Sequence, residues 1–159
     1  MISESSKTES PTEQNDIFGK TGNGTLDFGV ARSADWQNSN GRLLNVSIWT
    51  GDFDSIYASA LQSIGLEPVD TSADYNWEKF DKNLQSFASA FPQFPLLTAY
   101  QDMYKDYVLD SVELSELLNE CMILQKNTLS HAADLALRKL IYGCVEALKD
   151  DGCLIMICD

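Results

Sequence analysis

The side chains that could carry out chemistry in this chain are mostly carboxylates. The 159 residues include 24 acidic residues, four cysteines and a single histidine, His131. An enzyme needs a nucleophile, an acid–base group or a metal held in fixed geometry. The sequence motifs of serine hydrolases, zinc proteases and dinucleotide-binding enzymes do not occur, and nothing near His131 indicates a cysteine–histidine pair. We therefore expect a protein that is not an enzyme and binds no cofactor.

The cysteines indicate buried thiols. Cys121 and Cys144 fall on the apolar stripes of predicted helices, whereas Cys153 and Cys158 lie five residues apart on an apolar strand. An odd separation places the last two on opposite faces of a sheet, so they cannot pair with each other or share a zinc ion. No C-x-x-C motif is present. We expect free thiols in a reducing cytoplasm, with a metal or disulfide role as the alternative.

Acidic residues concentrate in two segments. Residues 52–81 hold seven acids against one base, and residues 102–120 hold six acids against one base. Their net charges of −6 and −5 make up −11 of the formal −13 of the chain. From these segments we take ten candidate partner-binding residues: Asp52, Asp54, Asp102, Tyr104, Asp106, Tyr107, Asp110, Glu113, Glu116 and Glu120.

The six acids of the second segment, which we call the acidic stripe, follow one another at steps of four, four, three, three and four residues. In a helix such positions lie along one side, where neighbouring like charges repel by roughly a few tenths of a kcal/mol per pair. Only Lys105 is present to relieve that repulsion. A ridge of carboxylates with tyrosines beside it suits docking on a basic protein surface, because long-range attraction accelerates encounter. The stripe therefore predicts a basic protein partner.

Other interpretations of the acids stay open. Acidic surfaces keep proteins soluble without any partner. Asp110 and Glu113 have the spacing of a helix capping box. The pair Asp52 and Asp54 could hold Mg²⁺ or Ca²⁺ in a metal-assisted enzyme, although no further ligand set follows. The chain could also be a scaffold or adaptor subunit that assembles through an apolar surface. For its own assembly we expect a monomer or a weak homodimer.

Strands are predicted at both ends of the domain. Residues 1–24 are rich in Ser, Thr, Glu, Asn and Gly and predict a disordered tail. Apolar residues alternate over residues 25–32 and 43–49, and Asn40-Gly41 between them favours a turn, so the two segments predict an antiparallel hairpin. Residues 154–158 are apolar on both faces, as in a strand inside a sheet.

Helices are predicted between these strands. They cover residues 50–65, a segment that begins after Ser72 or Asp74 and ends at Pro92, residues 96–107, residues 110–124, and a segment from Thr128 or Ser130 to Leu148. The order predicts one α+β domain over residues 25–159. In it a small antiparallel or mixed sheet, formed by the hairpin and the C-terminal strand, packs against about five helices.

Charge and hydropathy narrow the class of function. A net charge of −13 repels phosphate backbones and predicts no nucleic-acid partner. No apolar run reaches the roughly 18 residues of a transmembrane helix, so we expect no membrane association. The first 24 residues contain only three large apolar residues, which predicts no secretory signal peptide. We therefore expect a cytoplasmic protein.

The chain resembles the small acidic immunity proteins of bacterial contact-dependent and polymorphic toxin systems. The likeness lies in its size, its charge, its lack of catalytic motifs and its α+β pattern, including the C-terminal helix-to-strand segment from Ala147 to Asp159. No family-specific motif covers the chain, so no site residue is carried over. The resemblance implies a protein that neutralises a cognate toxin by direct contact, with a basic nuclease toxin as the natural counterpart.

Overall fold

The computed structural model of the chain describes residues 25–32, 42–70, 77–99, 107–127, 129–149 and 152–157. The expected N-terminal tail, residues 1–24, lies outside the described residues. So do three of the candidate partner-binding residues, Asp102, Tyr104 and Asp106, and the cysteine Cys158.

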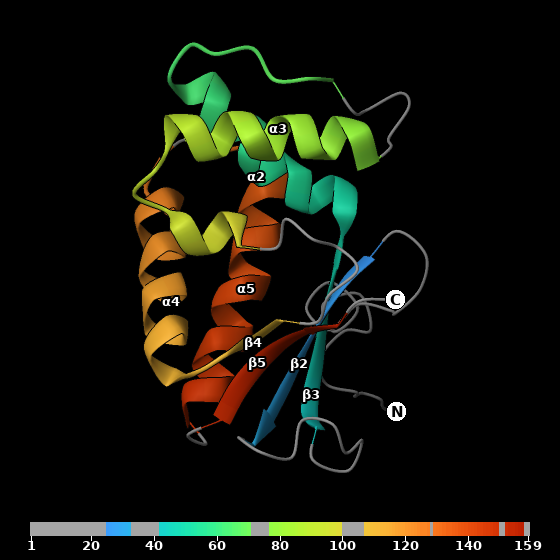
Figure 1. Cartoon of the computed structure of the whole chain (residues 1–159), viewed down its shortest axis with the longest axis vertical. Helices are drawn as coiled ribbons and strands as arrows, with labels where there is room; N and C mark the ends of the chain where they lie inside the picture. Colours follow the sequence, from blue (N-terminus) through green and yellow to red (C-terminus); the bar gives the residue numbers. More distant parts are fainter. Residues whose placement is uncertain are drawn as a thin grey trace, which may run out of the picture.

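A four-stranded antiparallel sheet forms one layer of the domain, with strands in the order β3-β2-β5-β4 (Figure 1). Strands β2 (Thr25–Arg32) and β3 (Arg42–Trp49) are the predicted antiparallel neighbours. Strand β5 (Gly152–Ile157) lies between β2 and the short strand β4 (Tyr107–Leu109). The prediction that the C-terminal strand lies inside the sheet is confirmed, because it has a paired neighbour on each side.

The two faces of the sheet bury different sets of side chains. Phe28, Val30 and Leu154 belong to the main hydrophobic core beneath the helices. Ala31, Cys153 and Ile155 form a small second cluster, as expected from the alternation of side chains along a strand. Gly152 begins β5 where a Cβ atom would collide with the carbonyl oxygen of Ala31, so the close approach of β5 to β2 at this point requires a glycine.

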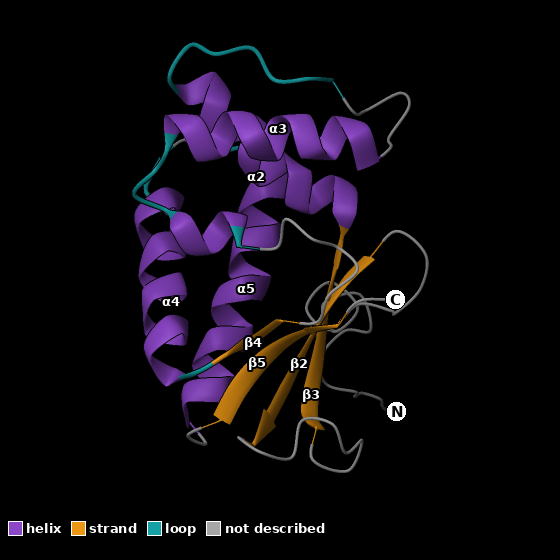
Figure 2. Ribbon diagram, in the orientation of Figure 1, coloured by secondary structure: helices purple, strands orange, loops and turns teal. Residues whose placement is uncertain are grey.

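The described residues also form four α-helices (Figure 2). They are α2 (Thr50–Ser63), α3 (Trp77–Ala90), α4 (Ser111–Gln125) and α5 (His131–Lys149). Helix α5 is central, because it packs against the sheet and also against both α2 and α4. A Cβ atom at Gly143 would lie 3.3 Å from the Leu154 side chain, so this glycine allows α5 to approach β5 closely.

Aromatic rings fill the core where α2 meets α3. The Tyr57 ring lies 5.7 Å from that of Phe80 and 5.0 Å from that of Phe87, measured between centroids. Its hydroxyl donates a hydrogen bond of 2.6 Å to the carbonyl of Leu97 in the 3-10 helix η3 (Pro95–Thr98). The buried tyrosine is thus satisfied, and it ties α2 to the segment that follows α3.

The prediction of a helix over residues 96–107 is wrong at both of its described ends, and the described residues form four α-helices rather than about five. Only the 3-10 helix η3 forms near its start, and Tyr107 belongs to strand β4. Tyr107, Val108 and Leu109 favour strands, and pairing with β5 satisfies their backbone. Residues 100–106, the rest of the predicted helix, lie outside the described part of the chain.

Two large apolar side chains next to helix ends lie at the surface. Ile64 is just beyond the end of α2 and is 51% exposed, and Trp77 at the first position of α3 is 48% exposed. Gly65, with φ of 80°, ends the first helix as expected, so Ile64 lies in the turn rather than on the helix.

Among the described residues, no helix has both the length and the apolar character needed to cross a membrane.

Candidate functional site

Helix α4 carries four of the seven described candidate residues, counting Asp110 at its N-terminus. The Asp110 carboxylate accepts a 2.9 Å hydrogen bond from the amide of Glu113, and the Glu113 carboxylate accepts one of 3.2 Å from the amide of Asp110. This reciprocal capping box confirms the local prediction made from the sequence. Both carboxylates remain near the surface while they stabilise the first turn.

Glu120 faces inward from the same helix. Its side chain is buried at 5% exposure, and its carboxylate accepts hydrogen bonds from the amides of Leu96, at 3.1 Å, and Leu97, at 2.9 Å. Burial raises the pKa of this carboxyl group above its usual range, whereas the two amides act to lower it and the nearby Glu116 raises it further. Glu120 therefore holds the N-terminal end of η3 and is not available to a partner at the surface.

The outward face of α4 presents a different set of side chains. We use this name for its exposed positions beyond Ser111, which are Val112, Ser115, Glu116, Asn119, Met122 and Ile123. At 100° per residue they fall within an arc of roughly 120°, on the side opposite to the buried leucines of the helix. Val112 is 66% exposed, Met122 is 52% exposed and Ile123 is 43% exposed. The face thus combines large apolar side chains with one carboxylate.

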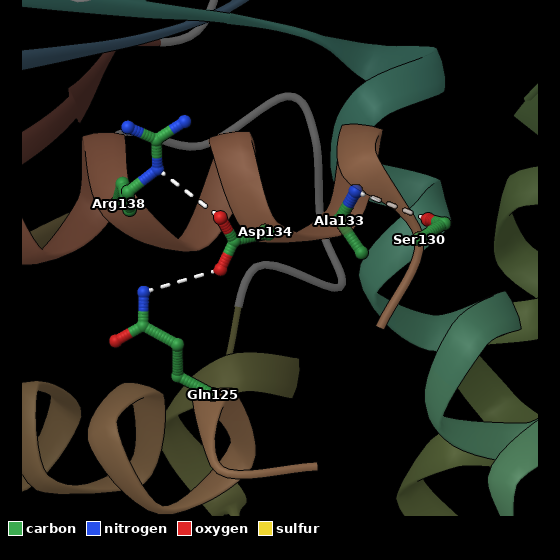
Figure 3. A network of polar contacts seen from close by, with 5 residues as sticks. All are labelled: Gln125, Ser130, Ala133, Asp134 and Arg138. Carbon is green, nitrogen blue, oxygen red and sulfur yellow. Dashed lines mark hydrogen bonds and ion pairs between the residues drawn. The ribbon is translucent and has the colours of Figure 1, made fainter. Parts of the chain in front are cut away.

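Helices α4 and α5 differ in whether their carboxylates have ion-pair partners on the same helix. Helix α4 contains no Lys or Arg, and Glu116 has no ion pair in the described part of the chain. On α5, the carboxylate of Asp134 pairs with Arg138 at 3.2 Å and accepts a hydrogen bond from Gln125 (Figure 3). The negative charge of α5 is therefore compensated locally, whereas that of α4 remains available to a cation from elsewhere.

The α2 candidates Asp52 and Asp54 differ from each other in exposure. Asp54 is 1% exposed, and its two carboxylate oxygens accept hydrogen bonds of 3.1 and 3.2 Å from the amide of Asn83 on α3. Asn83 also bonds both backbone groups of Val69. Asp52 is half-buried, and burial raises the pKa of its carboxyl group, against the lowering effect of Lys139 and His131. Asp54 is therefore part of the link between α2, α3 and the loop between them.

A cavity of about 450 Å³ opens beside this link. Its lining includes the carboxylates of Asp54, Glu67 and Asp70 and the hydroxyls of Ser59 and Ser130. The Ser59 hydroxyl already accepts a hydrogen bond from the amide of Ser130. Ser130, one of the two residues at which the sequence predicted that this helix begins, caps α5 by accepting a hydrogen bond from the amide of Ala133 (Figure 3). These polar groups support the junction of α2 with the start of α5.

The cysteines that could act as nucleophiles are buried, whereas the histidine that could activate them is exposed. Cys121, Cys144 and Cys153 are buried, as expected, and Cys121 and Cys144 are free thiols. Burial raises the pKa of Cys144 to about 12 and that of Cys121 well above its usual range, so both stay protonated thiols near neutral pH. His131 is exposed at the first position of α5. Within the described ranges, no three His, Cys, Asp or Glu side chains converge in a way that could hold a metal ion.

The structure does not gather the predicted candidates at one place. Helices α2 and α4 each pack on α5, so their acids belong to separate parts of the helical layer. Tyr107 lies in β4 and packs against the core. The apolar residues Val112, Met122 and Ile123 were missed by the sequence reasoning. The signal that could have found them is that α4 has apolar residues on both of its sides.

Comparison with known proteins gives no assignment: no family model, no curated protein and no solved structure matches this chain.

Proposed function

We propose that this protein is a non-catalytic binding protein that docks on a basic protein through its acidic surface. The observation that carries the proposal is the uncompensated charge of α4. Asp110 and Glu116 are exposed there, and the helix itself contains no base. Such a surface attracts a cationic partner over a distance of about a Debye length, roughly 8 Å at physiological salt.

The proposal also takes the form that the sequence resemblance implies. An immunity protein must occupy the functional surface of a toxin, and the surface of a nuclease toxin is basic because it binds nucleic acid. The surface acids of α4 supply the opposite charge. Asp102 and Asp106 extend the acidic stripe in the sequence, and we include them in the proposal as partner-binding residues.

The test first searches the reading frames beside the gene for this chain for one that encodes a basic domain, which is then purified as the candidate partner. Its association with the purified protein is measured at about 50 and about 300 mM sodium chloride. The proposal expects a complex whose association rate falls steeply with salt and in which the toxicity of the domain is lost. Absence of a complex, or a rate that does not change with salt, contradicts the proposal.

A second candidate function is a scaffold subunit that assembles through an apolar surface. The exposed side chains of Val112, Met122 and Ile123 favour it. This candidate predicts a stable dimer in light scattering that persists at high salt, because apolar association is not screened by ions. A monomer at all salt concentrations excludes it.

A further inference from the structure

We draw no further inference here: the strongest candidate, the cavity of about 450 Å³ beside α2 that is lined by Asp54, Ser59, Glu67 and Asp70, is a cluster of acidic side chains in which Asp54 and Ser59 already accept hydrogen bonds from Asn83 and Ser130, and nothing in the described part of the chain points to a ligand for it.

Discussion

Carboxylates have different surroundings, and therefore different roles, at the junction of α2 with α3 and on helix α4. At the junction, Asp54 is buried and bonded to Asn83, so its charge holds two helices and a loop together. On α4, Glu116 is exposed beside apolar side chains and has no ion pair among the described residues. Both regions looked alike as counts of acids in the sequence. The difference teaches that burial and hydrogen bonding, rather than charge density, decide which acids can meet a partner.

The largest effect that tests this difference between buried and exposed carboxylates is expected from the variant Asn83→Ala at the junction of α2 with α3. This change removes the donor to both oxygens of Asp54 and both bonds to the backbone of Val69. Because these groups are largely buried, we expect a loss of about 3 kcal/mol of unfolding free energy, measured by urea denaturation. The exposed neighbour on the same helix, Gln85→Ala, should change stability by less than about 0.5 kcal/mol. A loss of that small size for Asn83→Ala as well would show that the junction does not depend on this link.

A second test compares two acids within α4. Glu120→Ala leaves the half-buried amide of Leu96 and the buried amide of Leu97 without their acceptor, and we expect it to cost about 2 kcal/mol of unfolding free energy. Glu116→Ala removes an exposed carboxylate four residues away and should cost less than about 0.5 kcal/mol. Similar losses for both variants would contradict the division between an inward and an outward acid on this helix.

The same inward acid predicts a pH dependence. The pKa of Glu120 is raised above its ordinary value of 4.5, so in the window above that value the folded state binds more protons than the unfolded state. The stability that Glu120 contributes should therefore fall as the pH rises through this window and then level off above the folded-state pKa. Asp52 acts in the same direction, so the measurement is the difference in unfolding free energy between wild type and Glu120→Gln. A difference that grows in favour of the wild type with rising pH would mean that the amides of Leu96 and Leu97 outweigh burial.

Local patterns allowed much of the fold to be predicted. Alternating apolar residues identified β2, β3 and β5, and the capping residues Asp110 and Ser130 located the starts of α4 and α5. Strand β4 was missed because three residues are too few to show a period and because its partner, β5, lies more than 40 residues further along the chain. Pairing with β5, rather than a local sequence pattern, therefore determines the strand conformation of residues 107–109.

The candidate site was harder to predict than the fold. The spacing of the acids correctly indicated a helix from Asp110 onwards, but it could not show that Glu120 would face inward towards η3 while Glu116 faces outward. That contact depends on the position of Pro95–Thr98, which is set by packing between segments far apart in sequence. The exposure of Val112 likewise depends on which side of α4 faces α5.

Association kinetics of two charge-reversal variants test the central claim most directly. Glu116→Lys acts on the outward face of α4, and Asp81→Lys makes the same change of charge at an exposed position of α3. With the basic domain as partner at low salt, we predict that Glu116→Lys slows association about tenfold, whereas Asp81→Lys stays within about twofold of the wild type. Equal slowing by both variants would mean that only the net charge matters, and no slowing by Glu116→Lys would contradict a docking surface on α4.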